Sequence, residues 1–159
     1  MIRWSGPEDT TWILAKAERL GGPCLVSGGR LHDIRGLPAR IAMRDGERSG
    51  FSIAAPLCAE AVELLALLAD PEGQGTGRHL LQDAVANASA SGARRMVLDT
   101  TNDALRAQTL YRKAGFRLIA EEKGGFARVL ALKGIDPAEP VIGQGGVEIR
   151  NILRFEKVL

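Results

Sequence analysis

The chain has 159 residues, a formal net charge of +2 at pH 7 and 45% hydrophobic residues. That length supports one hydrophobic core and is short for two ordinary domains, so we expect a single domain over residues 1–159. Basic and acidic residues are intermixed, which argues against the basic stripe of a nucleic-acid-binding protein. Cys24 and Cys58 are the only cysteines and form no Cys-x-x-Cys pair, so we expect no zinc site, no redox motif and no other metal.

The amino-terminal segment MIRWSGPEDT contains no long apolar run. No stretch of the chain approaches the roughly 18 apolar residues of a membrane span. We therefore expect a cytoplasmic protein without a membrane partner.

The first third of the chain predicts a helix and then β-strands. Ser5 and Glu8 have the spacing of a capping box, and TWILAKAERL supplies helix formers up to Gly21–Gly22. The run CLVS predicts a short strand, and His32 falls in an expected loop. Asp45–Gly46 separates ARIAM from the alternating run FSIAA, which is a strong hairpin signal.

The middle of the chain predicts two strand-to-helix units. AVELLALLA, residues 61–69, favours a buried central strand, although its scarcity of β-branched residues leaves a short helix open. A glycine-rich loop and the helix RHLLQDAVANASAS follow, with the larger apolar residues on one helical face. The run MVL, residues 96–98, predicts the next strand, and Asn102 or Asp103 is expected to cap a second helix that ends at Gly115.

The last part predicts a strand over residues 116–120, a brief helix FARVLALK and a final strand in which Leu153 and Phe155 alternate with polar residues. The glycines of residues 143–146 precede a strand and therefore indicate a hairpin loop rather than an anion site. This order of elements predicts an α/β fold with a mixed central sheet of about six to seven strands flanked by helices.

The glycine-rich loop from Gly73 to Gly77 is the richest chemical feature. Glycines leave backbone N–H groups unobstructed, and the positive end of the following helix favours an anion such as pyrophosphate. An ordinary glycine-rich turn is the alternative. A Walker loop is excluded because the segment ends Gly77-Arg78-His79, and G-x-G-x-G lacks the spacing of a dinucleotide fingerprint.

Two segments carry a resemblance to a known superfamily. LLALLADPEGQGTGRHLL resembles the acyl-CoA-binding segment of the GNAT N-acyltransferases, and LRAQTLYRKAGF is similar to the helix and Gly-Phe turn that close the CoA site in that superfamily. The similarity covers mainly residues 55–120, and the tail VEIRNILRFEKVL resembles the ending of an uncharacterised bacterial branch. The resemblance implies the GNAT fold, acetyl-CoA as acyl-donor cosubstrate, and direct acetyl transfer to a primary amine in a ternary complex.

The resemblance also implies a set of cofactor-binding residues. Backbone N–H groups after the first strand would bind the pyrophosphate, and the end of that strand would flank pantetheine. The implied residues are Leu67, Leu68, Ala69, Gln74, Gly75, Thr76, Gly77, Arg78 and Asn102. Two positions depart from the family pattern: Glu72 replaces a Gln or Arg, and Ala104 replaces an Asn that Asn102 could substitute from two residues earlier.

Glu63 and Tyr111 are the candidate catalytic residues. Glu63 is the one charge in AVELLALLA and matches the catalytic Glu of several GNAT enzymes; a buried carboxylate is a stronger base than one in water. An exposed or salt-bridged glutamate is the alternative. Tyr111 matches the position beside the thioester sulfur, where a phenol can protonate the leaving thiolate, and a core aromatic is its alternative. Glu60 and Asp99 could reach the same end of the sheet as Glu63, but we expect each to be a surface or capping group.

A non-catalytic acyl-CoA-binding or sensing module on the same fold is the alternative function, which the departures at Glu72 and Ala104 make more credible. The expected acceptor is a small-molecule amine. Residues 20–38 and 123–146, which would shape the acceptor pocket, contain no charge cluster that indicates a more specific acceptor. A homodimer is compatible with the resemblance.

Overall fold

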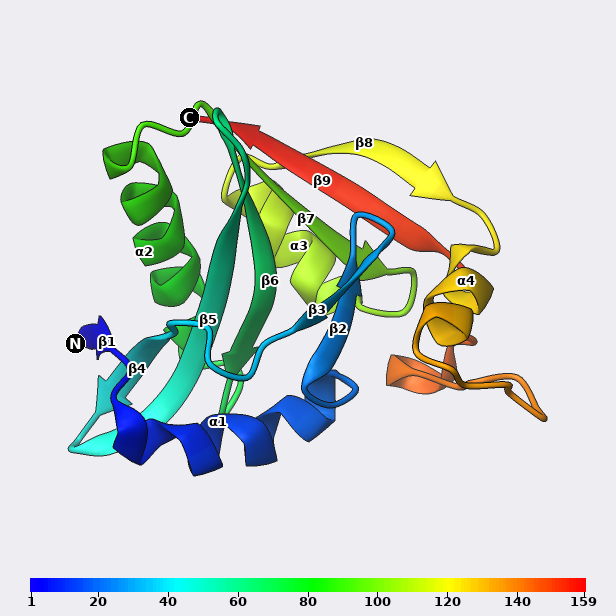
Figure 1. The fold of residues 1–159 in the computed structure, drawn as a ribbon, viewed down its shortest axis with the longest axis horizontal. Coiled ribbons are helices and arrows are strands. Elements are labelled where there is room, and N and C mark those ends of the chain that lie inside the picture. Colours follow the sequence, from blue (N-terminus) through cyan, green and yellow to red (C-terminus); the bar gives the residue numbers. More distant parts are fainter.

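A seven-stranded mixed sheet organises the protein, whose computed structural model describes residues 1–159 (Figure 1). The strands are β1 (Ile2–Trp4), β2 (Cys24–Ser27), β3 (Arg30–Asp33), β4 (Arg40–Arg44), β5 (Glu47–Cys58), β6 (Ala61–Ala69), β7 (Arg95–Thr101), β8 (Arg117–Glu122) and β9 (Ile152–Val158). The helices are α1 (Thr10–Ala17), α2 (Thr76–Ala90), α3 (Leu105–Lys113) and α4 (Gly125–Leu132), with short 3-10 turns at Pro7–Asp9, Glu18–Leu20 and Gln144–Gly146. The strand order is β1-β4-β5-β6-β7-β9-β8, and β2 and β3 form a separate hairpin. The predicted fold class is confirmed.

The sheet is covered on both faces, and each face has its own hydrophobic cluster. Ile13 of α1 and Phe51 of β5 belong to the cluster beneath α1 and the β2–β3 hairpin. Leu81 of α2 and Phe155 of β9 belong to the cluster beneath α2 and α3. Because β6 lies at the centre and is buried on both sides, its sequence is nearly continuous apolar residues instead of an alternating pattern.

The one parallel pair of the sheet, β6 with β7, is short. Ala61–Leu64 pair with Arg95–Leu98, and the pairing then stops although both strands continue. A bulge at Leu65 also interrupts the register of β6 with β5, because Ala54 pairs with Leu64 and Ile53 pairs with Ala66. The two central strands therefore separate from Leu65 and Asp99 onward.

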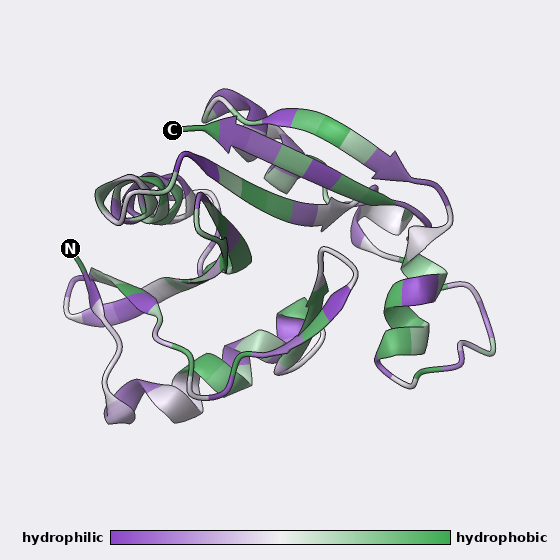
Figure 2. Ribbon diagram, turned by 45° about the horizontal axis from the view of Figure 1, so that its top comes forward, coloured by the Kyte–Doolittle hydropathy of each residue, from purple (hydrophilic) through white to green (hydrophobic).

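Strand β9 returns between β7 and β8, so the last strand of the chain is not the edge of the sheet. Its residues alternate between hydrophobic and hydrophilic (Figure 2), with Leu153 and Phe155 in the cluster beneath α2 and α3 and Arg154 on the opposite face. Strand β8 is the exposed edge, and α4 lies beyond its end (Figure 1). The predicted final strand is confirmed, and the strand predicted over residues 116–120 extends to Glu122.

Close packing between β5 and α2 depends on Gly50. A Cβ at Gly50 would lie 2.5 Å from the carbonyl oxygen of Leu68 and 2.9 Å from Cγ2 of Thr76. The β4–β5 hairpin turns at Asp45 and Gly46, with φ of 50° and 79°, as the Asp-Gly pair predicts. Gly50 therefore allows the start of α2 to lie against the sheet.

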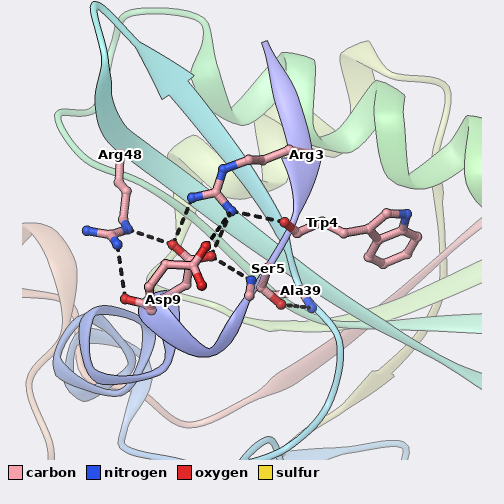
Figure 3. A network of polar contacts seen from close by, with 8 residues as sticks. Arg3, Trp4, Ser5, Asp9, Ala39 and Arg48 are labelled. Atoms are coloured by element: carbon pink, nitrogen blue, oxygen red, sulfur yellow. Dashed lines mark hydrogen bonds and ion pairs between the residues drawn. The ribbon is translucent and has the colours of Figure 1, made fainter.

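The predicted Ser5–Glu8 capping box is wrong. Asp9 instead caps the first turn of the amino terminus. The backbone N–H of Gly6 donates to Oδ2 of Asp9 at 2.8 Å, so the turn starts one residue later than predicted. The hydroxyl oxygen of Ser5 instead accepts from the backbone N–H of Ala39 at 3.0 Å (Figure 3). Strand β1 was not predicted, and the loop predicted around His32 is wrong because His32 lies on β3.

Candidate functional site

The loop between β6 and α2 presents consecutive free backbone donors. Gly73 and Gly75 have φ of 79° and 81°, a conformation that favours glycine. The N–H groups of residues 73–78 donate to no acceptor in the protein, and α2 begins at Thr76 immediately behind Gly75. Its first N–H groups have no partner within the helix, and its dipole adds positive charge at this end. These donors fit a pyrophosphate group.

Arginines surround this loop and balance Glu72. The Glu72 carboxylate accepts from Nη1 of Arg106 at 3.0 Å and from Nη2 of Arg19 at 3.4 Å. Nη2 of Arg44 donates to the carbonyl oxygen of Gln74 at 2.8 Å, and its Nη1 contacts the Gln74 side chain. The carboxylate that departs from the family pattern is therefore paired, and the surroundings of the loop favour an anion.

The carboxyl-terminal half of β6 has no partner strand on its β7 side. Leu67, Leu68 and Ala69 pair with β5, while the pairing with β7 ends at Leu64. Leu68 is buried beneath α1, and Leu67 packs against the opposite cluster. The free edge of β6 is compatible with a flanking pantetheine chain, and that contact stays a prediction.

Glu63 combines the two environments that the sequence left as alternatives. Its side chain is 3% exposed, as a desolvated base requires, yet its Oε2 lies 2.9 Å from Nη2 of Arg154. Oε2 is buried and meets this guanidinium as an ion pair without a well-formed hydrogen bond. Nε2 of His32 lies 3.6 Å from Oε1 of Glu63 and 3.2 Å from the carbonyl oxygen of Ser27.

Arg154 and Asp99 complete a charged cluster with Glu63, in which the sequence analysis missed Arg154 and allowed Asp99 only as an alternative. Nη1 of Arg154 donates to Oδ1 of Asp99 at 2.7 Å, and Oδ2 of Asp99 accepts from the backbone N–H of Gly28 at 2.8 Å. Burial alone lowers the pKa of the Arg154 guanidinium, but its hydrogen bond to Asp99 and the two nearby carboxylate charges of Asp99 and Glu63 outweigh burial and raise the pKa. Arg154 therefore stays charged. The expectation that Asp99 is a surface or capping group is wrong, whereas Glu60 is exposed as expected.

A cleft of about 230 Å³ opens beside this cluster, between the tip of the β2–β3 hairpin and α4. Its lining includes the charged residues Asp99, Glu122, Arg128 and Arg154. A larger hollow, of about 670 Å³, lies between β4 and α2 and borders the glycine-rich loop through Arg44 and Thr76. The smaller cleft is lined by Gly28 and Arg154, which both lie next to Glu63.

Tyr111 lies in the hydrophobic cluster on the face opposite Glu63. Its ring centroid is 6.0 Å from those of Phe116 and Phe155. Burial raises the pKa of Tyr111 to about 12, and its hydroxyl forms no hydrogen bond with the protein. The position agrees with a core aromatic, and its raised pKa keeps the phenol protonated, as a proton donor must be.

Asn102 and Asp103 do not cap α3, whose N-cap is Ala104 without a side-chain bond. The Asn102 amide donates to the carbonyl oxygen of Glu148 at 2.9 Å and accepts from the N–H groups of Arg150 and Asn151 at 2.8 and 2.9 Å. Asp103 likewise accepts from the N–H of Gln144 at 2.9 Å. Both residues attach the connection before β9 to the sheet, and the contact of Asn102 with pantetheine stays a prediction.

No cluster of three or more histidine, cysteine and acidic side chains is arranged to hold a metal ion, and no helix is long and apolar enough to cross a membrane.

The separated central strands and the loop behind them combine a free strand edge with a set of anion-binding backbone donors. Residues 39–118 match the model of the acetyltransferase (GNAT) domain, and the chain belongs to this family. Among curated proteins, it is 31% identical over 97 residues to the uncharacterized protein YdhI of Bacillus subtilis (strain 168). The match covers 61% of this chain and 59% of YdhI, so it spans less than two thirds of that relative.

Solved structures share the fold over nearly the whole chain. A GNAT family acetyltransferase from Elizabethkingia anophelis with acetyl-CoA bound superposes with a TM-score of 0.70 at 20% identity, covering 100% of this chain and 97% of that one. A Bacillus subtilis acetyltransferase in complex with CoA gives 0.72 at 19% identity, covering 99% and 97%. The ribosomal-protein-S18-alanine N-acetyltransferase of Escherichia coli gives 0.66 at 15% identity, covering 98% and 92%.

Proposed function

We propose that the protein is an acetyl-CoA-dependent N-acetyltransferase that moves an acetyl group directly to a primary amine. The observation that carries the proposal is the separation of β6 from β7 after Leu64, followed by free N–H groups from Gly73 onward. A separated strand edge can hold the extended part of acetyl-CoA, and the loop can hold its pyrophosphate. Family membership and the acetyl-CoA and CoA complexes of two structural relatives support this role.

In the proposed reaction, Glu63 receives a proton from the bound ammonium group and leaves a neutral amine nitrogen. Nη2 of Arg154 lies 2.9 Å from Oε2 of Glu63, and this ion pair fixes the position of the carboxylate. The bulge at Leu65, which has no register partner in β5 or β7, supplies a backbone N–H for the thioester carbonyl oxygen.

The amine nitrogen attacks the thioester carbon, an N–C bond forms, and the C–S bond breaks. Tyr111 gives its proton to the departing thiolate and recovers one from the nitrogen of the new amide through solvent. A phenol with pKa about 12 remains protonated at neutral pH and is a stronger base than the thiolate once ionised. The net products are an amide, the CoA thiol and one proton.

A non-catalytic acyl-CoA-binding module remains the second candidate, and one observation favours it. The Glu63 carboxylate is ion-paired with Arg154 at 2.9 Å, and such a pair can serve the fold without taking part in catalysis. A binding module would retain affinity for acetyl-CoA and show no turnover with any amine. Turnover therefore separates the two candidates.

Calorimetric titration of the protein with acetyl-CoA and with CoA tests the binding half of the proposal. Gly75→Glu places a carboxylate among the phosphate donors and should weaken binding at least 100-fold. Gly36→Glu is the matched control, because both glycines have φ of 81° and open space where a Cβ would lie. The proposal expects micromolar binding by the wild type and by Gly36→Glu. A folded wild type that binds neither ligand would overturn it.

A further inference from the structure

One of the arginines around the glycine-rich loop is held less firmly than the others. Arg44 uses both terminal nitrogens on one loop residue, and Arg19 lies between two carboxylates, 3.5 Å from Asp70 and 3.4 Å from Glu72. Arg106 has Glu72 as its one ionic partner, through Nη1 at 3.0 Å, and its Nη2 forms no hydrogen bond with the protein. The side chains of Arg106 and Glu72 are 69% and 54% exposed. An ion pair this exposed contributes little to stability, so Arg106 can leave Glu72 at small cost.

Arg106 lies where an anion in the loop would meet it. Glu72 follows β6, and Arg106 is in the first turn of α3, which follows β7, so their ion pair joins the ends of the two separated strands. A Cβ at Gly73 would lie 3.4 Å from Nη2 of Arg106, and a Cβ at Gly77 would lie 3.6 Å from Cδ2 of Leu110, one helical turn later. One face of α3 therefore runs along the free N–H donors of the loop, with Arg106 beside the first of them.

The Glu72 carboxylate and a pyrophosphate group would compete for the same guanidinium. Pyrophosphate has a higher negative charge than a carboxylate and offers oxygens on two phosphorus atoms, which suits the planar fork of an arginine. The unpaired Nη2 of Arg106 is the second donor that such a bidentate contact needs. Arg106 therefore gains more from a pyrophosphate than it loses when it leaves Glu72.

Glu72 would also oppose a bound pyrophosphate directly. It immediately precedes Gly73, the first residue with a free donor, so two like charges would lie close together. Arg19 stays within reach of both Glu72 and Asp70 when Arg106 leaves, so the Glu72 carboxylate keeps a cationic partner. The cost of moving Arg106 is thus limited to one exposed ion pair.

We propose that Arg106 exchanges the Glu72 carboxylate for the pyrophosphate of bound CoA, so that Arg106 is a cofactor-binding residue and Glu72 is a competitor that weakens CoA affinity. The inference rests on the proposed binding of acetyl-CoA and adds to it a residue outside the loop. It also gives the departure at Glu72 a consequence: the cation beside the loop comes from α3, and the carboxylate makes CoA easier to release.

Calorimetric titration with CoA and with dephospho-CoA tests the exchange, because dephospho-CoA lacks the 3′-phosphate and retains the pyrophosphate. Arg106→Gln should weaken the binding of both ligands by the same factor, about 10- to 100-fold, the effect of losing a charged contact. Glu72→Ala should tighten the binding of both by about threefold or more, since it removes the competitor and its repulsion. In the double variant the gain from Glu72→Ala should shrink, because no arginine is left to compete for.

The chain supplies a matched control pair. Arg94 and Glu60 lie 3.8 Å apart with side chains 80% and 65% exposed, and they stand just before β7 and β6 instead of just after them. Arg94→Gln and Glu60→Ala should keep both affinities within about twofold of the wild type. General loosening of the loop would weaken binding in Arg106→Gln and in Glu72→Ala alike, whereas the exchange changes their affinities in opposite directions.

The outcomes separate this inference from the proposed function. If the wild type binds CoA, three results each overturn the exchange: unchanged or weaker binding by Glu72→Ala, additive effects in the double variant, or a loss in Arg106→Gln that appears with CoA and not with dephospho-CoA. Failure of the folded wild type to bind CoA overturns the proposed function itself, and the exchange with it.

Discussion

Replacing Asp9 with asparagine should destabilise the fold in a pH-dependent way. The Asp9 side chain is fully buried and accepts four hydrogen bonds: two from Arg3 at 2.7 and 2.9 Å, one from Nε of Arg48 at 2.8 Å and one from the N–H of Gly6 at 2.8 Å (Figure 3). These bonds join β1, β5 and the start of α1. The asparagine side chain would keep the shape of the aspartate but lose the charge that binds two guanidinium groups.

The size of the destabilisation depends on how well water replaces the hydrogen bonds that Arg3 and Arg48 lose. Hydrogen bonds to charged groups contribute about 1.5–3 kcal/mol each when a partner stays buried. The side chains of Arg3 and Arg48 are each 31% exposed, so water replaces part of what they lose. We therefore expect Asp9→Asn to reduce the free energy of unfolding at pH 7 by about 2–3 kcal/mol rather than by the full sum.

The pH dependence has a defined sign. Hydrogen bonds from Arg3, then from Gly6 and Arg48, hold the pKa of Asp9 well below its ordinary value despite burial. A carboxyl with a depressed folded-state pKa stabilises the protein fully above its unfolded-state pKa, near 4, and loses that contribution as pH falls toward the folded-state value. The difference between wild type and Asp9→Asn should therefore shrink by about 1 kcal/mol between pH 7 and pH 3.

Urea unfolding at both pH values, followed by circular dichroism, measures this difference. Asp45→Asn is the control, because Asp45 forms no ion pair and asparagine also accepts its φ of 50°. The control should stay within about 0.5 kcal/mol of the wild type. A loss at pH 7 below about 1 kcal/mol for Asp9→Asn, or a loss that does not change with pH, would refute the reasoning.

Two further substitutions examine the core that supports the site. Tyr111→Phe should lower kcat about 100-fold or more, because it removes the proposed proton donor. The melting temperature should stay near that of the wild type, because the hydroxyl forms no hydrogen bond in the fold. An unchanged kcat in steady-state kinetics would make Tyr111 a core aromatic only. Gly50→Ala should destabilise by about 1–3 kcal/mol, since its Cβ would lie 2.5 Å from a backbone oxygen of β6. A melting temperature by calorimetry within about 1 °C of the wild type would show that β5 and α2 adjust freely.

The sequence predicted the elements whose signals are local. AVELLALLA is β6 over the residues expected, and Asp45–Gly46 makes the expected turn. The phosphate-binding hypothesis rested on glycines that supply free N–H groups through their own backbone, so it needed no distant partner. The first capping box failed because Ser5 bonds to Ala39, which is remote in sequence.

The charged cluster could not be predicted either, because its residues are also remote from one another in the sequence. Arg154 follows the alternation of β9, and nothing in its neighbours indicates that the β2–β3 hairpin covers that face. Its contacts with Glu63 and Asp99 arise because β9 returns beside β7, which is a property of the topology. The sequence correctly placed Glu63 on the central strand. It offered burial and a salt bridge as alternatives, whereas in the fold Glu63 is both buried and ion-paired.

Steady-state kinetics of Glu63→Gln, with acetyl-CoA and an amine that the wild type uses, tests acetyl transfer through this site most directly. Glu60→Gln is the matched control, because Glu60 lies three residues earlier, is exposed and faces Arg94 at 3.8 Å. We expect Glu63→Gln to bind CoA with wild-type affinity and to lose about 100- to 10,000-fold in kcat/KM at neutral pH, while Glu60→Gln keeps both. Turnover by Glu63→Gln within about threefold of the wild type would contradict the assignment of Glu63 as the base.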